Sequence, residues 1–492
     1  MEILSAFWST FIAHFLTVLY IVDFIIALTI IFLERKNPSA TLAWIMVLFL
    51  LPVAGIILYL LFSQNIARKK IFRLSRFEEQ TIENALKEQI DEIDSGRFVF
   101  TNRESRKWRD MIRLNQKYGK AYFTQDNRIK VITDGESMHE SLLKDIRNAR
   151  STINMMYFII KNDYVGKEVI RVLTEKAKQG VEVRLLIDAI GGRQILDYVV
   201  SDLREAGGQV FFFFPPRFKF LKFVNTKLNY RNHRKIVVID GKIGYIGGFN
   251  IGKEYVGHKK KFGFWRDTHL RLTGSGVQDL NARFIMDWRF ASKERLVVSE
   301  AYYSEVEQHG TTGIQIVSSG PDANREEIKR AYMKMIATAT RSVYLQTPYF
   351  VPDDSLYESL KMASQSGVDV RIMIPCMPDH MFVYWATYSY VGELIRSGVR
   401  VFIYDNGFLH AKTIMVDGEV ASIGSANFDR RSFKLNFEAN AFIYDGQEVR
   451  ELERIFEEDM EVCHELTQEL YDKRSLMIKF KESIARLLSD LL

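Results

Sequence analysis

Two long apolar runs open the chain, and their length predicts helices that cross a membrane. The first covers residues 7–33 and is nearly all apolar, with His14 and Asp23 as its main interruptions. The second covers residues 42–62 and contains no charged side chain. About 20 apolar residues are enough for a helix to span a bilayer. Because only the short polar segment 34–41 separates the runs, we expect a hairpin of two transmembrane helices.

Beyond the apolar runs, the hydrophobic pattern changes twice. Residues 66–127 are highly charged and have helical periodicity, which predicts a helical linker or collar. From residue 128, short strand-like apolar runs alternate with helical segments, and this alternation is typical of an α/β fold. VEVRLLID (181–188) and VDVRIMIP (368–375) are two such strands, and each follows a predicted helix that ends in glycine.

These two strands belong to a long internal repeat. AKQGVEVRLLI (177–187) matches ASQSGVDVRIMI (363–374), and EAGGQVFFFF (205–214) matches IRSGVRVFIY (395–404). A repeat of this length predicts two copies of one structural unit, which we expect to pack about a pseudo-twofold axis. The predicted organisation is a membrane anchor at residues 1–65, a charged helical linker at 66–127, a first α/β unit at 128–300 and a second at 301–492 that ends in an amphipathic helix.

The repeat also preserves polar residues in register. RNHRKIVVIDGKIGYIGGFN (231–250) aligns with GFLHAKTIMVDGEVASIGSANFD (407–429), and each copy contains the pattern H-x-K-x4-D. Duplication of a fold preserves apolar and glycine positions, but it gives no reason to keep histidine, lysine and asparagine in step, so we predict one active site built by both copies. The candidate catalytic residues are His233, Lys235, Asp240, His410, Lys412 and Asp417; the candidate phosphate-binding residues are Asn250, Asn427 and Ser425; and Asp267 and Glu438, each at the head of an apolar strand, are the candidates to orient the histidines.

The chemistry of these side chains favours a phosphodiester substrate. Residues i and i+2 of a strand face the same way, so His233 and Lys235 should point into one space, as should their counterparts in the second copy. Cations and amide donors without a carboxylate cluster suit a phosphate group, and we expect neither a metal nor another cofactor. One neutral imidazole can form a covalent phosphohistidine while the other transfers the proton.

The two aspartates of the signature are expected to behave differently from the histidines and lysines. Asp240 and Asp417 each lie beyond an apolar run of four residues, which places them about 13 Å from the histidine if the run is a strand. We therefore expect them to shape turns and bond locally rather than to act as acids.

Charge and cysteine content narrow the setting of this site. The net charge is +6, which is compatible with anionic lipid or with nucleic acid. Two cysteines, Cys376 and Cys463, show no ligand or disulfide spacing and favour a reducing compartment. Five basic residues follow the second apolar run, against two in the preceding loop, so the catalytic part should be cytoplasmic. The five are Arg68, Lys69, Lys70, Arg73 and Arg76.

The paired HxKxxxxD signatures resemble the phospholipase D superfamily. With ERKNPSATLAWIMVLFLLPVAGIILYLL (34–61) and TPYFVPD (347–353), the whole chain is similar to the bacterial cardiolipin synthases. The resemblance implies two phospholipase D-like α/β-sandwich units and a multi-pass enzyme of the bacterial cell membrane. It also implies a phosphatidyltransferase that condenses two phosphatidylglycerol molecules into cardiolipin and glycerol, and it favours His233 as nucleophile and His410 as acid/base, although pseudosymmetry leaves that assignment open.

Other readings of the same residues remain. Water or another alcohol, such as serine, can accept the phosphatidyl group from the same covalent intermediate, which would make the protein a phospholipase D or a different synthase. A membrane scaffold with an inactive site is a further alternative. We expect phosphatidylglycerol and anionic membrane lipid as partners and no nucleic acid, and the sequence leaves the oligomeric state open.

The first copy contains an insertion before its histidine that the second lacks. The insertion includes FFFFPPRFKFLKF (211–223), in which aromatic and basic residues alternate. It is either a packed strand followed by a surface loop or an interfacial element that rests on anionic lipid.

Overall fold

The computed structural model describes residues 2–34, 38–62, 71–72, 74–193, 195, 197–215, 229–294, 296, 310–323 and 325–489. The chain divides into two compact units. The smaller unit contains Met1–Ile66 and Pro216–Tyr230, and the larger unit contains Ala67–Pro215 and Arg231–Leu492. Of the FFFFPPRFKFLKF segment (211–223), residues 211–215 are described and residues 216–223 lie outside the described residues.

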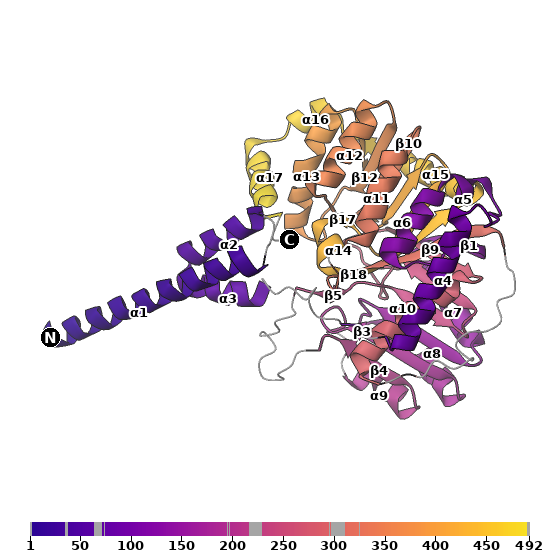
Figure 1. Ribbon diagram of the computed structural model, residues 1–492, viewed down its shortest axis with the longest axis horizontal. Coiled ribbons are helices and arrows are strands. Elements are labelled where there is room, and N and C mark those ends of the chain that lie inside the picture. The colour runs from indigo at the N-terminus through magenta and orange to yellow at the C-terminus, as the bar shows by residue number, and fades with distance from the viewer. Residues whose placement is uncertain are drawn as a thin grey trace. The chain divides into compact units, whose positions relative to one another are not determined.

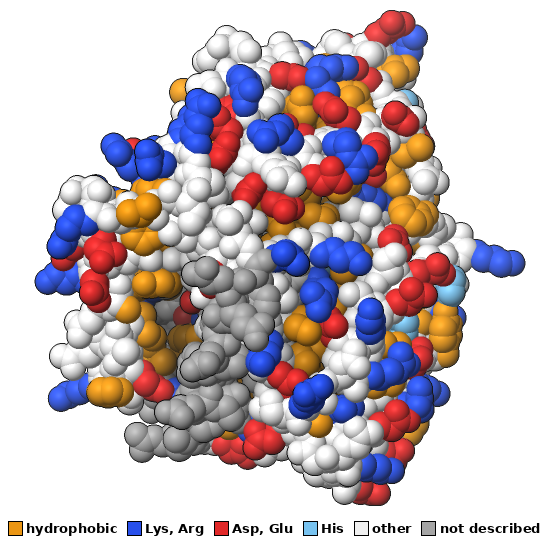
Figure 2. All heavy atoms as spheres, turned by 90° about the vertical axis from the view of Figure 1, so that its right-hand side faces the viewer, with side chains coloured by type: hydrophobic (Ala, Val, Ile, Leu, Met, Phe, Trp, Pro, Cys, Tyr) orange, Lys and Arg blue, Asp and Glu red, His pale blue; other side chains and the backbone are white. Residues whose placement is uncertain are grey.

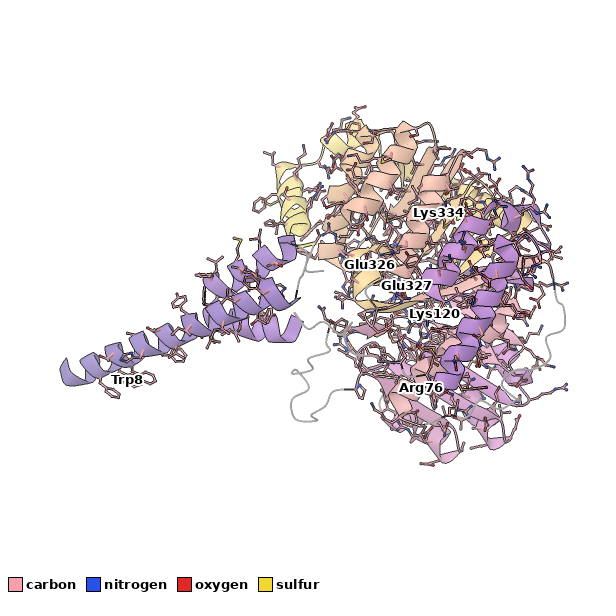
Figure 3. The ribbon with its side chains drawn as sticks, in the orientation of Figure 1. Trp8, Arg76, Lys120, Glu326, Glu327 and Lys334 are labelled. Carbon is pink, nitrogen blue, oxygen red and sulfur yellow. The ribbon has the colours of Figure 1, made fainter. Side chains whose placement is uncertain are left out.

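The smaller unit begins with one long apolar helix. α1 (Glu2–Thr29) continues as the π-helix η1 (Ile30–Glu34). By length and composition, Thr10–Phe32 is the one helical stretch among the described residues that could cross a membrane, and only 18% of its most apolar window is buried. Trp8 projects away from the helix (Figure 3) and is 55% exposed. A helix that is apolar and uncovered by protein suits contact with lipid.

The second apolar run, for which we expected a single transmembrane helix over residues 42–62, forms two helices instead. α2 (Pro38–Leu50) and α3 (Pro52–Phe62) are separated by Leu51. Proline lacks the backbone N–H that a helix requires, and its ring crowds the preceding turn. Pro52 therefore ends α2 and begins α3, which is the helical position that tolerates proline best.

The two short helices fold back on each other. The rings of Trp44 and Tyr59, on opposite sides of the break, lie 5.5 Å apart between centroids. Ile30, Leu48 and Tyr59 form a small buried cluster, so both helices also pack against the end of the long helix (Figure 1). At Gly55 an added Cβ would lie 2.8 Å from the carbonyl oxygen of Val47, so only glycine permits this close approach.

The charged segment after the apolar runs belongs to the larger unit. Its helices are α4 (Arg76–Asp94), α5 (Arg103–Lys107) and α6 (Arg109–Gly119). Ser75 and Glu78 form a capping box that starts α4. Met111 and Ile112 of α6 are fully buried in the core of the second half of this unit. The segment therefore packs as part of the α/β unit instead of standing apart from it as a collar.

The remainder of the larger unit consists of two halves, and the second repeats the order of elements of the first with some additional elements. The first half contains β1 (Thr124–Asp134), α7 (Gly135–Asn148), β2 (Thr152–Tyr157), α8 (Tyr164–Lys178), β3 (Glu182–Asp188), α9 (Asp197–Glu205), β4 (Gln209–Phe213), β5 (Arg231–Asn232), β6 (Ile236–Ile239), β7 (Ile243–Gly247), β8 (Trp265–Thr273) and α10 (Gly276–Ser292). The second half contains β9 (Thr312–Ser319), α11 (Glu327–Thr338), β10 (Ser342–Gln346), β11 (Phe350–Val351), α12 (Asp354–Gln365), β12 (Asp369–Pro375), α13 (Met381–Arg396), β13 (Arg400–Tyr404), β14 (Phe408–Leu409), β15 (Thr413–Val416), β16 (Val420–Gly424), β17 (Phe428–Asp429), α14 (Arg430–Lys434), β18 (Asn436–Tyr444), α15 (Gly446–Glu461), β19 (Cys463–Glu465), α16 (Gln468–Asp472) and α17 (Leu476–Leu488). The additional elements of the second half are β11, β17, α14, β19, α16 and α17.

Strand order confirms the duplication. In the first half the order is β4-β3-β2-β6-β7-β8-β1, and in the second it is β13-β12-β10-β15-β16-β18-β9. β1 and β9 pair antiparallel and join the two sheets. The innermost parallel strands, such as β2, are buried along their whole length, because helices cover both faces of such sheets. Each half has its own apolar core.

Two very short strands cross from one half to the other. β5 of the first half pairs in parallel with β18 of the second, and β14 of the second half pairs in parallel with β8 of the first. Each of these crossings comes directly before one of the two signature histidines. The duplicated fold therefore delivers both histidines to the boundary between its halves.

Candidate active site

The backbone of each signature histidine is attached to the opposite half of the larger unit. The N–H of His233 donates to the carbonyl of Phe437 at 2.9 Å, and the N–H of His410 donates to the carbonyl of Arg266 at 2.7 Å. Residues 233–235 and 410–412 lie between strands rather than within them. The two histidines are 8% and 7% exposed and line the same pocket.

The two candidate orienting carboxylates hold the histidines crosswise. Nδ1 of His233 lies 3.0 Å from Glu438 of the second half, and Nδ1 of His410 lies 2.5 Å from Asp267 of the first half. Both carboxylates are fully buried. A carboxylate fixes the proton on Nδ1, so the lone pair of Nε2 is available to the pocket. The sequence predicted both partners but did not reveal that each serves the other copy's histidine.

Burial favours the neutral form of both imidazoles. It lowers the pKa of His233, which Glu438 partly opposes and Lys235 reinforces. Burial, reinforced by Lys412, lowers the pKa of His410 to about 4. The pKa of each carboxylate is itself lowered: burial opposes ionisation, but the hydrogen bond from the imidazole and the charge of the neighbouring lysine outweigh it. The site therefore combines two imidazoles, two carboxylates and two lysines.

The two signature lysines lie close to their histidines. Nζ of Lys235 donates to the carbonyl of His233 at 2.7 Å and lies over the ring of Phe158. Nζ of Lys412 donates to the carbonyl of His410. Burial lowers the pKa of Lys235 to about 7 and that of Lys412 to about 8. An incoming phosphate would restore the charge on both lysines, because an adjacent anion favours the ammonium form.

Asp240 and Asp417, which complete the signature, do not reach the pocket. The carboxylate of Asp240 accepts hydrogen bonds from the backbone N–H groups of Arg150, Ser151 and Thr152. The carboxylate of Asp417 accepts equivalent bonds from residues 340–342. Each lies at a turn beyond its strand and ties that turn to the start of a neighbouring strand, which is the local role that we expected of both.

The three candidate phosphate ligands separate into two groups. Asn250 and Asn427 line the pocket. Ser425 does not; its hydroxyl bonds the backbone of Ala439, and its carbonyl lies 3.0 Å from Nδ1 of His233. The side chain of Ser425 is thus corrected from a phosphate ligand to a support for the adjacent strand.

Gly248, the counterpart of Ser425 in the first copy, explains why the two copies differ there. A Cβ at Gly248 would lie 2.0 Å from the carboxylate of Asp267. The shorter aspartate needs this space in order to reach His410. The glutamate of the second copy is longer, and a serine fits beside it.

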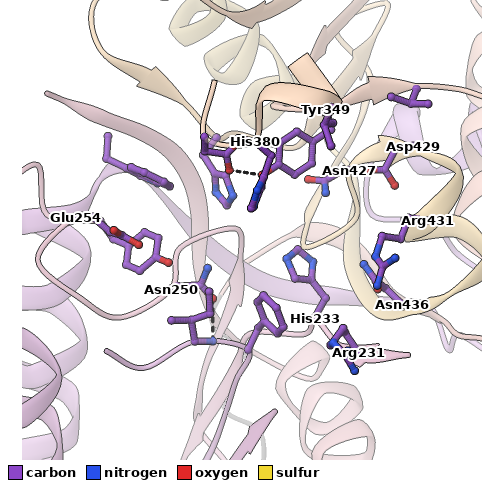
Figure 4. Close-up of a pocket in the computed structure, with 18 of the residues that line it drawn as sticks. Arg231, His233, Asn250, Glu254, Tyr349, His380, Asn427, Asp429, Arg431 and Asn436 are labelled. Atoms are coloured by element: carbon purple, nitrogen blue, oxygen red, sulfur yellow. Dashed lines mark hydrogen bonds between the residues drawn. The ribbon is translucent and has the colours of Figure 1, made fainter. Parts of the chain in front are cut away.

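The pocket between the halves has a volume of about 550 Å³, which is within the range of small-molecule sites. Several of its lining residues were not predicted from the sequence: Arg231, Arg431, Asn436, Glu254, Tyr349, Asp379 and Lys259. Figure 4 labels the first five of these together with His233. His380 also lines the pocket. Among the residues that the structure describes, no group of three metal-ligating side chains is present.

Comparison with known proteins places this architecture in a class. A family model described as "Cardiolipin synthase, PLD-like domain" matches residues 142–288 and 332–460, more than half of the chain. A second, described as "Phospholipase_D-nuclease N-terminal", matches residues 21–64. The crystal structure of phosphatidylserine synthase from Haemophilus influenzae shares the fold, with a TM-score of 0.59, 16% identity, and coverage of 77% of this chain and 97% of that one. The larger unit is therefore a phospholipase D-like fold with two copies of its domain.

Curated relatives define the family more narrowly. The chain is 48% identical to the major cardiolipin synthase ClsA of Bacillus subtilis (strain 168), over 97% of this chain and 98% of that protein. It is 47% identical to the cardiolipin synthase of Staphylococcus aureus (strain N315), over 96% and 95%. The chain belongs to the cardiolipin synthase family of phospholipase D-like enzymes.

Proposed function

We propose that this enzyme transfers the phosphatidyl group of one phosphatidylglycerol to a glycerol hydroxyl of another, which yields cardiolipin and free glycerol. The observation that carries this proposal is the crossed pair of histidine–carboxylate contacts at one pocket, in a chain that matches cardiolipin synthases over nearly its whole length. Two imidazoles, two lysines and two asparagines suit a two-step displacement at a phosphodiester.

In the first step, Nε2 of one histidine attacks phosphorus, and the bond from phosphorus to the glycerol oxygen breaks. The other histidine, protonated, gives its proton to the departing glycerol. The negative phosphodiester itself raises the pKa of the buried imidazoles when it binds, so that one of them can hold this proton. Lys235 and Lys412 stabilise the charge that grows on the phosphorus substituents.

In the second step, the hydroxyl of a second phosphatidylglycerol loses its proton to the same acid/base histidine and attacks phosphorus. The phosphorus–nitrogen bond breaks and returns the first histidine to its neutral form. Family resemblance favours His233 as the nucleophile and His410 as the acid/base. The same intermediate serves water or another alcohol, so the acceptor must be determined by measurement.

Product analysis tests this proposal. Purified protein in vesicles of labelled phosphatidylglycerol should form cardiolipin and release glycerol. Phosphatidic acid as the main product would instead indicate a phospholipase D, and a product formed with an added alcohol such as serine would indicate another synthase. The variants His233→Ala and His410→Ala should each lose all products, and substantial turnover by either would contradict the two-histidine mechanism.

We also propose a bacterial membrane location with the larger unit on the cytoplasmic side. Exposed apolar side chains along Thr10–Phe32 support one membrane span. α2 and α3, of 13 and 11 residues, have lengths of about 20 Å and 17 Å, and neither reaches across a hydrocarbon core of about 30 Å. Their mutual packing supports a hairpin that enters the membrane and returns to the same side.

A re-entrant α2–α3 hairpin also agrees with the positions of the basic residues in the sequence. Arg35 and Lys36 precede the short helical hairpin, and Arg68, Lys69 and Lys70 follow it. If α2 and α3 return to one side, all five cations lie on the cytoplasmic face, as the positive-inside rule favours. If the second run crossed fully, the first two cations would be outside.

Lipid rather than nucleic acid remains our expected partner. On the face of the protein in Figure 2, acidic and basic side chains are interspersed, so the modest net charge is not gathered there into one basic surface. Phosphatidylglycerol is the substrate class that we propose.

A further inference from the structure

We propose that Arg231, Arg431 and Asn436 form a second phosphate subsite beside His233, which binds the phosphate of the lipid that is not being substituted. This inference rests on the proposed function, because only an acceptor that is itself a phospholipid brings a second phosphate into the pocket. The subsite would distinguish phosphatidylglycerol from water and from free glycerol as acceptors.

The three side chains come from both halves and meet in the pocket that contains the two histidines. Arg231 on β5 and Asn436 on β18 are direct partners in the short parallel pairing that crosses between the halves. Arg431 belongs to α14, which directly precedes β18. All three line the pocket, and Figure 4 shows them together on one side of His233.

Two guanidinium groups at this wall concentrate positive charge. Burial lowers the pKa of Arg231, and the nearby charge of Arg431 lowers it further. Asp188, which opposes this effect, also accepts backbone N–H bonds from Ile190, Gly191 and Asn232. Asp429, Glu438 and Asp188 offset part of the charge of Arg431. A phosphate suits this wall because the planar guanidinium can bind two of its oxygens at once.

Asn436 adds a hydrogen-bond acceptor to the same wall. The residue is 6% exposed, and its Nδ2 donates to Glu438 at 3.1 Å. Its Oδ1 has no hydrogen-bond partner within the part of the chain that the structure describes. A buried acceptor without a donor is costly. A hydroxyl of the glycerol that links two phosphates would supply the missing donor.

The opposite wall of the pocket is less suited to a second anion. There Lys161 and Lys259 share the carboxylate of Glu254, at 3.3 Å and 2.8 Å. Asp429 also lines the pocket and its charge acts on Arg431, so a carboxylate is present on both sides. The two walls differ in their cations, because a lysine acts as a point charge whereas an arginine can bind two phosphate oxygens at once. The arginine wall is therefore the better place for the second phosphate, which a single glycerol separates from the reacting hydroxyl.

Two reactions of the same enzyme distinguish binding of the second phosphate from binding of the reacting phosphate. Formation of cardiolipin from phosphatidylglycerol vesicles requires both. Exchange of the phosphatidylglycerol headgroup with labelled free glycerol passes through the same phosphohistidine but requires only the reacting phosphate. The variants Arg231→Gln, Arg431→Gln and the double variant should lower the ratio of cardiolipin formation to exchange by about tenfold to a hundredfold, the range for one charged hydrogen bond.

Matched variants make this experiment decisive. Lys434→Gln removes one positive charge from the same short helix at an exposed position outside the pocket lining, and its ratio should stay at the wild-type value. Arg431→Lys should give an intermediate ratio, since it keeps the charge but loses the planar fork. The exchange reaction also reports whether each variant is folded.

Two results would overturn the subsite. An equal fall of both reactions in the arginine variants would mean that these residues act on the reacting phosphate or on folding. An unchanged ratio in the double variant would mean that the second phosphate binds elsewhere. A wild-type enzyme that performs exchange but forms no cardiolipin would contradict the proposed function itself, and that result is visible without any variant.

Discussion

Each histidine of the pocket depends on a carboxylate from the other half, so neither copy of the duplicated unit holds a complete acid–base group. Glu438 lies at the start of β18, and the short pairing of β18 with β5 brings it to His233. The equivalent pairing of β14 with β8 brings Asp267 to His410. Loss of either half would therefore leave the remaining histidine without its partner.

This crossing makes a prediction for single substitutions. Glu438→Gln should lower kcat by about a hundredfold to ten thousandfold, the usual contribution of a positioned acid–base group. The substitution should also lower the pKa of His233 further, because in the wild-type protein the charge of Glu438 raises that pKa. NMR titration of labelled histidine measures this shift. Asp267→Asn is the matched control and should lower the pKa of His410 instead. A shift of His410 in the Glu438 variant would contradict the crossed pairing.

The lysines predict how activity depends on pH. The pKa values of Lys235 and Lys412 are about 7 and about 8, so both ammonium charges are lost as the pH rises through this range. Those charges stabilise the phosphate, so the enzyme loses this stabilisation when they are lost. Accordingly, kcat/KM should fall as the pH rises above about 7 to 8.

Arginine replacement tests the origin of that alkaline limb. In Lys235→Arg or Lys412→Arg the guanidinium stays charged, so a variant that remains active should keep kcat/KM to higher pH. A pH profile of phosphatidylglycerol turnover in mixed micelles measures the limb. If kcat/KM of both variants falls over the same pH range as that of the wild type, the lysines do not cause the fall.

At this scale the sequence identified side chains better than contacts. His233 and His410 were identified because they occur at the same position of both repeats, and a duplicated fold keeps such polar residues aligned only when they have a chemical role. It could not distinguish a carboxylate that serves its own copy from one that serves the other. Arg231 and Asn436 were missed because they become neighbours only through a two-residue strand between the halves.

At the scale of elements, the aspartates of the signature act as clamps. The carboxylate of Asp417 accepts three backbone N–H bonds at 2.7–3.0 Å from residues 340–342, just ahead of and at the start of β10. Asp417 itself lies in the left-handed region, at φ +57°, in the turn between β15 and β16. The clamp therefore fixes the hairpin that follows His410 against the neighbouring strand β10, which pairs antiparallel with β15.

We expect Asp417→Asn to reduce stability rather than chemistry. An amide replaces one acceptor oxygen by a donor that faces other N–H groups, at a cost of about 1.5–3 kcal/mol. The thermal midpoint should fall by several degrees, while the folded fraction keeps its specific activity. Glu469→Gln, at a side chain that is 77% exposed, is the control and should leave the midpoint unchanged. A large loss of kcat without loss of stability would restore a catalytic role for Asp417.

Long elements were predictable from periodicity, and short ones were not. The equivalent strands β3 and β12 of the two halves were predictable from their continuous apolar runs. The two-residue strands β5 and β14 have no periodicity to detect, although they position the site. The break at Leu51 carried a local signal, since proline follows it, but an uncharged run of 21 residues suggested one helix.

At the scale of the whole molecule, duplication accounts for the larger unit, and one pairing completes it. β1 and β9 join sheets whose seven shared strands have the same order, so the boundary between the halves is a continuous structure. This continuity holds the two histidines at fixed positions. The proposed two-step displacement requires this, because one histidine must reach the phosphorus while the other reaches the oxygen that leaves or enters. The repeat in the sequence was sufficient to predict this duplication; the joining strands were not distinguished from any others.

Membrane topology is the remaining property of the whole chain, and its two models make opposite predictions. One span followed by a re-entrant α2–α3 hairpin puts the N-terminus outside the cell and the loop at residues 35–37 inside. Two full spans reverse both positions, and both models keep the larger unit inside. A single cysteine at Ser5 or Asn37, in a background with both natural cysteines replaced by serine, reports these sides to a membrane-impermeant maleimide on intact cells.

We expect Ser5→Cys to react on intact cells and Asn37→Cys to react only after the membrane is opened. The reason is that α2 and α3 are each too short to span and pack against each other through Trp44 and Tyr59. Thr101→Cys, at an exposed position of the larger unit, is the internal control and should also require opening. Labelling of Asn37→Cys from outside, with Ser5→Cys protected, would establish two complete spans.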